Sequence, residues 1–243
     1  VKQITTDNRL HTICQSGNCP NMGECWGAGT ATFMILGNIC TRSCGFCSVQ
    51  TGRPLPPDLK EPRKVAESIK MMNVKHAVIT SVDRDELQDG GASIWAETIN
   101  QIRKLCPNTT METLIPDFKG NKKDIQKIID VAPEVVSHNI ETVERLTKKV
   151  RIQAKYNRSL DVLNFLQTSG MRTKSGIMLG LGETDDEVVK TMKDLRSVGV
   201  SIMTIGQYLQ PTKKHLPIVE FIHPDKFDNF KKIGLDIGFR IVE

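Results

Sequence analysis

Three cysteines stand close together in the middle of a short polar stretch. Cys40, Cys44 and Cys47 have the spacing C-x3-C-x2-C, and no fourth cysteine or histidine follows nearby. A structural zinc site uses four protein ligands, whereas an iron–sulfur cluster held by three cysteines leaves one iron open to another molecule. The spacing therefore favours an open cluster. A zinc knuckle or an unrelated cysteine-rich turn is the alternative.

The cysteine count raises the question of a disulfide framework. The chain has 243 residues and seven cysteines, six of them within the first 47 residues. Disulfide frameworks are typical of small secreted proteins, but this chain is long and its first residues lack the apolar core of a signal peptide. No apolar stretch has the length of a bilayer span. Metal ligation in a reducing compartment is the better interpretation, with no membrane association.

A second set of cysteines lies upstream of the first. Cys14, Cys19 and Cys25 form a C-x4-C-x5-C pattern in a segment rich in glycine and asparagine, with no helical or strand period around them. A loop this irregular needs a tether, and metal binding can supply part of the folding free energy. The pattern predicts a second cluster. A zinc site completed by His11 is the alternative.

From residue 31 onward, short apolar runs alternate with amphipathic segments, which predicts an α/β fold. The runs are rich in Val, Ile, Met and Leu, as is typical of buried parallel strands, and the alternation implies right-handed βαβ units. Thr184 and Glu187 have the pattern of a helix capping box. The predicted strands are Ala31–Gly37, His76–Val82, Thr109–Pro116, Val135–Glu141, Lys174–Gly180 and Ile202–Leu209.

Six such units are too few for a closed barrel, which needs eight. We therefore expect a partial (β/α)6 TIM-like barrel over residues 31–211, an N-terminal cysteine-rich extension over 1–30 and a C-terminal extension over 212–243. The last segment is expected to hold a helix near residues 225–235 and a strand over 237–243. Polar residues end or follow the predicted strands, on the side where barrel enzymes build their sites. They are the Cys40 loop, Asp83–Glu86, Asn139 with Glu141, Gly180–Glu183 and Gln207–Gln210.

The run from Cys40 to Cys47, with Phe46 before the last cysteine, resembles the cluster loop of radical S-adenosylmethionine (SAM) enzymes. In that superfamily the open iron binds SAM and passes it an electron, and a 5'-deoxyadenosyl radical forms. Together with the upstream cysteines, the chain resembles the lipoyl synthase family almost end to end. The blocks that carry this resemblance include Gly23–Trp26, Thr80–Asp85, Pro116–Phe118, His138–Thr142, Tyr156–Leu160, Lys174–Gly180 and Gly206–Pro211.

The resemblance implies insertion of two sulfur atoms, at C6 and C8 of an octanoyl chain on a lysine of a lipoyl carrier domain or of the glycine-cleavage H protein. It implies two [4Fe-4S] clusters: Cys40, Cys44 and Cys47 hold the one that cleaves SAM, and the three upstream cysteines hold an auxiliary one that supplies sulfur. An electron donor such as flavodoxin or ferredoxin, an iron–sulfur carrier, and a cytoplasmic or, in a eukaryote, mitochondrial matrix location are also implied. In the family a serine near the C-terminus completes the auxiliary site. The sequence given stops before that motif, and we expect that the motif was not retained.

Position at strand ends and the same resemblance make several residues candidates for contacts with SAM. Ordinary interior polar residues and a plain turn are the alternatives for each of them. Cys106 precedes Pro107 at a predicted helix end and is expected to be a small buried residue. The SAM-binding candidates are Asp83, Glu112, Asn139, Arg158, Gly180 and Gly182.

The formal net charge of +5 favours an acidic partner. Lys148, Lys149 and Arg151 form one basic cluster that we expect to attract an acidic carrier, with solvated helix faces as the alternative. Nucleic-acid binding is not supported, because aromatic content is only 5% and no stacking motif accompanies the charge. Other functions left open are a different two-cluster sulfur-inserting radical SAM enzyme, an iron–sulfur electron carrier and a zinc-binding module.

Overall fold

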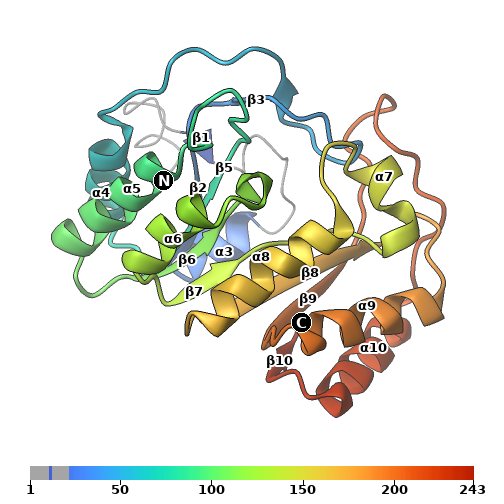
Figure 1. Cartoon of the computed structure of the whole chain (residues 1–243). Helices are drawn as coiled ribbons and strands as arrows, with labels where there is room; N and C mark the ends of the chain where they lie inside the picture. Colours follow the sequence, from blue (N-terminus) through green and yellow to red (C-terminus); the bar gives the residue numbers. More distant parts are fainter. Residues whose placement is uncertain (1–10, 13–21) are drawn as a thin grey trace. The chain divides into compact units, whose positions relative to one another are not determined.

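The computed structural model describes residues 11–12 and 22–243 (Figure 1). The chain divides into two compact units: an N-terminal unit of residues 1–42 and 48–135, and a C-terminal unit of residues 43–47 and 136–243. Cys14 and Cys19, two of the predicted auxiliary ligands, lie outside the described residues. Among the described residues, no helix combines the length and the apolar character that a membrane crossing requires.

The N-terminal unit is built on a mainly parallel sheet. Its strands run in the order β1 (His11–Thr12), β2 (Thr30–Ile35), β5 (His76–Ser81) and β6 (Thr110–Leu114). The pairs β2–β5 and β5–β6 are parallel, while β1 is antiparallel to β2. A separate parallel pair consists of β3 (Ile39–Cys40) and β4 (Gln50–Thr51). The sequence predicted the three longer strands, but two-residue strands show no period.

Helices cover this sheet through amphipathic faces. In α4 (Glu61–Met71) and α5 (Ala92–Leu105), which lie side by side in Figure 1, Ile69, Trp95 and Ile99 are fully buried. The unit also contains α3 (Met22–Gly27), η1 (Phe118–Gly120) and α6 (Lys122–Asp130). The expectation of an irregular loop around Cys25 was therefore wrong for its described part, because six residues form a helix too short to show a period.

The C-terminal unit is also built on a parallel sheet, in the order β7 (Val135–Ser137), β8 (Thr173–Leu179), β9 (Ile202–Gln207) and β10 (Ile241–Val242). Its helices are η2 (Glu144–Leu146), α7 (Thr147–Val150), α8 (Tyr156–Thr168), α9 (Asp185–Ser197) and α10 (Pro224–Ile237). The predicted last strand begins later than expected, because α10 continues to Ile237 and ends at Gly238, whose φ is 103°. The capping box of Thr184 and Glu187 is confirmed at the start of α9.

Close packing in the C-terminal unit depends on a glycine inside a helix. An ideal Cβ at Gly234 of α10 would lie 2.7 Å from Met192 Cε on α9 and 2.8 Å from Val242 Cγ2 on β10. Met192 and Val242 are themselves almost fully buried. The absent side chain at Gly234 therefore lets α10 approach both neighbours. The boundaries predicted at residues 30 and 211 stay predictions.

Within each unit the polar motifs follow the strands, as predicted. In the N-terminal unit, Cys40 comes after β2 and Asp83 and Asp85 come after β5. Asp117, which was not among the predicted polar motifs, comes after β6. In the C-terminal unit, Asn139 and Glu141 come after β7, the Gly180 turn after β8, and Gln207 at the end of β9. Since the strands that precede them are parallel within each unit, their carboxyl ends share one edge of that unit's sheet.

Candidate active site

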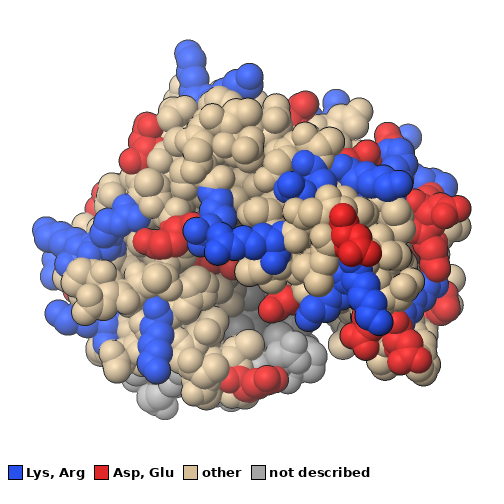
Figure 2. All heavy atoms as spheres, turned by 90° about the horizontal axis from the view of Figure 1, so that it is seen from below, with Lys and Arg blue, Asp and Glu red and all other residues tan. Residues whose placement is uncertain are grey.

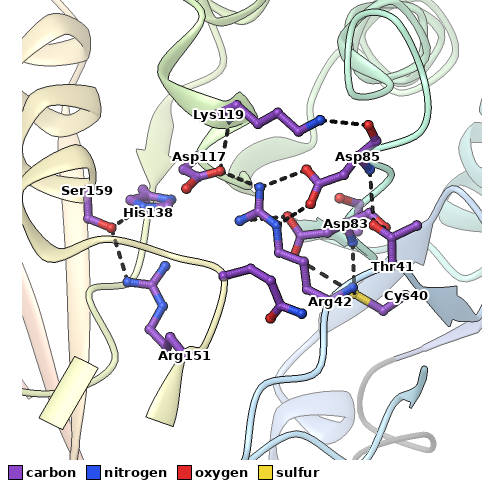
Figure 3. Close-up of polar contacts among 12 residues, drawn as sticks. Cys40, Thr41, Arg42, Asp83, Asp85, Asp117, Lys119, His138, Arg151 and Ser159 are labelled. Carbon is purple, nitrogen blue, oxygen red and sulfur yellow. Dashed lines mark hydrogen bonds and ion pairs between the residues drawn. The ribbon is translucent and has the colours of Figure 1, made fainter. Parts of the chain in front are cut away.

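The first cysteine of the run lies in the N-terminal unit and its sulfur receives two backbone N–H groups (Figure 3). Cys40 Sγ lies 3.4 Å from the Arg42 nitrogen and 3.3 Å from the Asp83 nitrogen. The same sulfur is 3.9 Å from Asp83 Oδ2. Amide donors stabilise negative charge on sulfur, and hydrogen bonds to cluster sulfurs tune reduction potentials. Two amide donors and one carboxylate oxygen therefore surround the Cys40 sulfur.

Arg42, two residues further on, is a buried hub for three carboxylates. Its Nε and Nη2 donate to the two oxygens of Asp85 at 2.7 and 2.8 Å, and Nη2 also donates to Asp117 Oδ1 at 2.7 Å. Nη1 lies 3.3 Å from Asp83 Oδ1. Burial lowers the pKa of Arg42, but the hydrogen bond to Asp85, the charge of Asp83 and the contacts with Asp117 outweigh burial and raise it. The side chain is 5% exposed and permanently charged.

Thr41 and the turn after β6 complete this arrangement. The Thr41 nitrogen and hydroxyl both donate to the Asp83 oxygen, at 3.0 and 2.9 Å, and the hydroxyl accepts from the Asp85 nitrogen at 3.0 Å. Asp117 accepts from the Lys119 nitrogen, and Lys119 Nζ donates to the Asp85 oxygen. Lys119 has φ 54°, a left-handed conformation that costs energy in a residue with a side chain. These bonds hold that strained turn in place.

The other two cysteines of the run lie in the C-terminal unit, where separate contacts hold them. The Gly45 nitrogen donates to the Val150 oxygen at 2.9 Å, and the Leu216 nitrogen donates to the Gly45 oxygen at 3.0 Å. His215 Nε2 lies 3.0 Å from the Cys47 oxygen. An ideal Cβ at Gly45 would come within 2.9 Å of Leu216, so glycine permits this close approach.

The donor chemistry of this run fits an iron–sulfur cluster. Cys40, Cys44 and Cys47 are thiols of intermediate exposure, and thiolate is the ligand that such clusters use. No three His, Cys, Asp or Glu side chains in the described part of the chain converge on a single-ion position. A four-iron cluster spaces its ligands more widely than one ion does, because each cysteine binds a different iron. Cys25, on α3, is a fourth thiol of intermediate exposure.

The residues on either side of Asn139 in the chain, His138 and Ile140, belong to a buried polar network in the C-terminal unit. His138 Nε2 is 2.9 Å from Ser159 Oγ, which accepts from Arg151 Nη1 at 3.0 Å, as Figure 3 shows. Arg151 Nη1 also lies 3.1 Å from the Ile140 oxygen. Arg151 is only 7% exposed, so the prediction that it belongs to a surface docking cluster was wrong. Its guanidinium serves the interior of the unit instead.

Glu141 sits in this network with a strained backbone. Its φ is 67°, and burial raises the pKa of its carboxyl, while the charge of Arg151 and a hydrogen bond from Asn139 oppose that rise. Its nitrogen donates to the Gly176 oxygen and its oxygen accepts from Met178, both at 2.9 Å. Strained residues held by such contacts cluster at functional sites.

The structure distributes the six predicted SAM-contacting residues over both units. Asp83 adjoins Cys40, and Glu112 is half-buried within β6, opposite Val78 of β5. Asn139 bonds Glu141, and Arg158 is half-buried in the first turn of α8.

The two glycines among these candidates differ. An ideal Cβ at Gly180 would lie 2.5 Å from both Gln207 Nε2 and the Glu220 oxygen, whereas one at Gly182 would come no closer than 3.7 Å to Val219. Both have positive φ, 103° and 99°. Packing within the unit is therefore sufficient to explain glycine at position 180.

The sequence analysis gave no individual role to Arg42, Asp117 or His215. Arg42 stands inside the cysteine run, and that position was its only signal. Asp117 and His215 are distant in the chain from the residues they contact, so spacing alone could not connect them. Cys106 is confirmed as a small buried residue, 8% exposed, whose sulfur lies 3.5 Å from the Ala66 oxygen.

A pocket of about 190 Å³ adjoins the segment that leads to Cys40 in the N-terminal unit. Leu36, Pro57, Glu61 and Arg84 are among its lining residues. Glu61 accepts from the Leu36 nitrogen at 2.7 Å, and burial raises the pKa of its carboxyl against the effect of that bond. Arg84 donates to the Leu36 oxygen at 2.8 Å. These buried charges fix the backbone ahead of the cysteine run.

Acidic and basic side chains are interspersed over the face that Figure 2 shows. Ion pairs among the described surface residues include those of Lys190, which lies 3.0 Å from Glu144 and 2.7 Å from Asp194. Lys148 and Lys149 are exposed and form no ion pair among the described residues. A lysine that pairs with neighbouring carboxylates, such as Lys190, has its charge balanced on the surface. The two lysines of α7 differ because they form no such pair among the described residues.

Comparison with known proteins agrees with this geometry. The profile of the radical SAM superfamily matches residues 34–195. Methylornithine synthase (PylB) has a TM-score of 0.64 at 11% identity, with 99% of this chain and 81% of that chain covered. SuiB of Streptococcus suis, bound to its precursor peptide SuiA, has a TM-score of 0.68 at 9% identity, covering 86% and 47%. The fold and the cysteine site thus define a radical SAM protein with an α/β, partial TIM-like barrel.

Sequence relatives narrow this class. The chain is 68% identical to a lipoyl synthase of Christiangramia forsetii, covering 100% of this chain and 83% of that protein. It is 66% identical to a mitochondrial lipoyl synthase of Nematostella vectensis, covering 100% and 84%. The chain belongs to the lipoyl synthase family, and it is therefore an enzyme that forms the lipoyl cofactor by radical SAM chemistry. That family uses a [4Fe-4S] cluster and SAM, and its substrate is a lipoyl carrier protein. Membership in the family excludes the two alternative functions of an iron–sulfur electron carrier and a zinc-binding module.

Proposed function

We propose that the enzyme inserts sulfur at C6 and C8 of an octanoyl group carried on a protein lysine. The observation that carries this proposal is the Cys40 sulfur, half-buried after a parallel strand and receiving two amide N–H groups. A [4Fe-4S] cluster at Cys40, Cys44 and Cys47 would supply the electron that cleaves SAM. Radical chemistry suits the substrate, since an unactivated methylene group offers no acidic proton and no electrophilic carbon.

The auxiliary site is the second part of the proposal. Cys14, Cys19 and Cys25 would hold a second [4Fe-4S] cluster that donates sulfur. The C-x4-C-x5-C spacing and the family resemblance support this assignment. Of these three cysteines, Cys25 lies within the described residues, on α3, and its side chain is half-buried.

The protein residues would bind and orient SAM. Asp83 stands beside the Cys40 sulfur, where its carboxylate can receive a polar group of the methionine or ribose portion. Asn139 is oriented by Glu141 after β7. Glu112 and Arg158 are half-buried polar candidates, and the backbone at Gly182 has room on its Cα side, which the packed Gly180 lacks.

Partners follow from the same reaction. An octanoylated lipoyl carrier domain or the glycine-cleavage H protein would be the substrate, flavodoxin or ferredoxin the electron donor, and an iron–sulfur carrier the source of new clusters. Lys148 and Lys149 are exposed positive charges that would attract an acidic carrier. The thiolate clusters favour a reducing compartment, the cytoplasm or the mitochondrial matrix of a eukaryote.

The test is a turnover assay with reconstituted protein. The enzyme is incubated anaerobically with an octanoyl-lysine peptide, SAM and reductant, and the peptide is analysed by mass spectrometry. Products with one and then two added sulfur atoms are expected, with 5'-deoxyadenosine released. Release of 5'-deoxyadenosine without sulfur addition, from protein carrying both clusters, would contradict the proposal and point to a different substrate.

A further inference from the structure

Arg42 occupies an unusual position for a buried arginine. Leaving a buried charge without its partner is strongly destabilising, so the partners of a buried arginine are rarely incidental. Arg84, which is also buried, donates to the oxygens of Leu36 and Leu55 and contacts one carboxylate, that of Glu86. Arg42 instead contacts three carboxylates, those of Asp83, Asp85 and Asp117. One positive charge therefore meets three negative ones.

The geometry connects this cluster to the Cys40 sulfur. Asp83 contacts both groups: its Oδ1 lies 3.3 Å from Arg42 Nη1, and its Oδ2 lies 3.9 Å from Cys40 Sγ. The Arg42 backbone nitrogen is also one of the two donors to that sulfur. Asp85 and Asp117 thus hold the guanidinium in place. The guanidinium in turn contacts Asp83, the carboxylate that lies beside the Cys40 sulfur.

We propose that Arg42 is a positioning residue that ties the Cys40 segment to the ends of β5 and β6, and that the charge balance of Arg42, Asp83, Asp85 and Asp117 sets the reduction potential of the cluster at Cys40. This inference rests on the proposed role of Cys40 as a cluster ligand. A planar guanidinium can bind Asp85 through two atoms while it contacts Asp117, which the single ammonium of lysine cannot do. The charges of these four side chains would act directly on the cluster beside Cys40, since Asp83 contacts both Arg42 and the Cys40 sulfur.

Two substitutions of opposite sign separate charge from shape. D117N removes one negative charge but keeps a side-chain oxygen for Arg42 and for the Lys119 nitrogen. R42Q removes the positive charge that the three carboxylates share. Because negative charge near a cluster disfavours adding an electron, D117N should move the midpoint potential to more positive values and R42Q to more negative ones. A purely structural role would not produce opposite shifts.

The measurement is a redox titration followed by electron paramagnetic resonance. The full chain with C14A/C19A/C25A is used, so that only the cluster of the Cys40 run contributes to the signal. D89N is the matched control in the N-terminal unit, since Asp89 also accepts backbone amides and contacts a cation, Lys127 at 2.8 Å. Its potential should equal that of the parent. D85N, at a carboxylate that is 28% exposed, repeats the test if D117N does not fold.

A second readout uses protein without the cluster. R42K keeps the positive charge but loses the planar guanidinium that binds Asp85 through two atoms. The backbone amides of Thr41 and Asp85 should therefore exchange with solvent at least tenfold faster than in the parent. The amides of α9 should not change. Equal potentials in D117N, R42Q and D89N would overturn the electrostatic part, and unchanged exchange in R42K the positioning part. The turnover assay on octanoyl-lysine tests the proposed function separately, because a cluster with a shifted potential is still a cluster.

Discussion

His215 Nε2 lies 3.0 Å from the backbone oxygen of Cys47, although 168 positions separate the two residues in the chain. His215 Nδ1 lies 2.9 Å from Thr212 Oγ1, so the ring is held on both sides. The neighbouring Leu216 nitrogen bonds the Gly45 oxygen. The segment after β9 therefore supports the last two cysteines of the run.

H215A should loosen that support. Loss of one hydrogen bond of about 1 kcal/mol predicts about fivefold faster hydrogen exchange at the amides of Gly45 and Leu216, and H215Q should restore part of the protection. H223A is the control, because His223 caps α10 and contacts Asp225, within the same unit and away from the cysteine run. Equal exchange in H215A and H223A would contradict a specific role.

Removal of single thiols distinguishes ligands from packing. C40A, C44A and C47A should each lose most of the iron of the SAM-cleaving cluster and all 5'-deoxyadenosine formation. C106A removes a buried sulfur at the end of α5 and should retain iron and activity, with a modest fall in Tm. Iron and sulfide analysis after anaerobic reconstitution measures this, and full iron content in C40A would disprove its role as a ligand.

The two glycines after β8 give a matched pair. G180A and G182A both place a side chain at positive φ, which costs about 1–3 kcal/mol, but only G180A also meets Gln207 and the Glu220 oxygen at 2.5 Å. Overpacking adds about 1–3 kcal/mol, so the Tm of G180A should fall several degrees further than that of G182A. If G182A weakens SAM binding while its Tm falls only slightly, the result would support contact of the backbone at position 182 with SAM.

The start of α9 should give the protein a defined acid sensitivity. The hydrogen bonds and charge of Arg145 lower the pKa of Glu187 to about 2, from an ordinary value of 4.5. A lowered folded pKa stabilises the protein above the unfolded pKa, and this contribution disappears as pH falls toward the folded value. The Tm difference between the parent and E187Q should therefore be constant near neutral pH and narrow below about pH 4.5.

The control for this series is D228N, which removes an exposed carboxylate of α10 that forms no ion pair among the described residues. Its Tm difference from the parent should stay flat over the same pH range. A Tm difference for E187Q that widens on acidification would contradict the assignment of the lowered pKa to the folded state.

The lysines of α7 should matter for the carrier protein and not for a peptide. K148E/K149E should raise KM for an acidic carrier domain by about tenfold at low salt and much less at high salt, because screening removes steering. K231E/K232E makes the same charge change on α10 and should have little effect. Equal KM values for the two double variants would exclude α7 as the docking site. Arg151 is left intact, since its guanidinium is buried.

The longer strands were predictable because each is a bounded run of buried apolar residues, as Phe33 in β2 and Met203 in β9 illustrate. The cysteine run was predictable because its members are neighbours in the chain. The contact of Arg42 with Asp117 was not predictable from the sequence, since 75 positions separate the two residues and no local pattern links them. The prediction that Glu141 ends the strand over 135–141 was wrong, because β7 ends at Ser137 and Glu141 forms only an isolated bridge with Ile177. Its left-handed φ of 67° is held by bonds to Gly176 and Met178 that no local pattern reveals.

The close contact at Gly234 has a consequence for engineering this enzyme. Replacing a helical glycine with alanine is an ordinary route to higher thermal stability, worth about 1 kcal/mol where space allows. Here the new methyl group would collide with Met192 and Val242 and push α10 outward. Consensus-style stabilisation of this helix must therefore avoid position 234, or shorten both Met192 and Val242 at the same time.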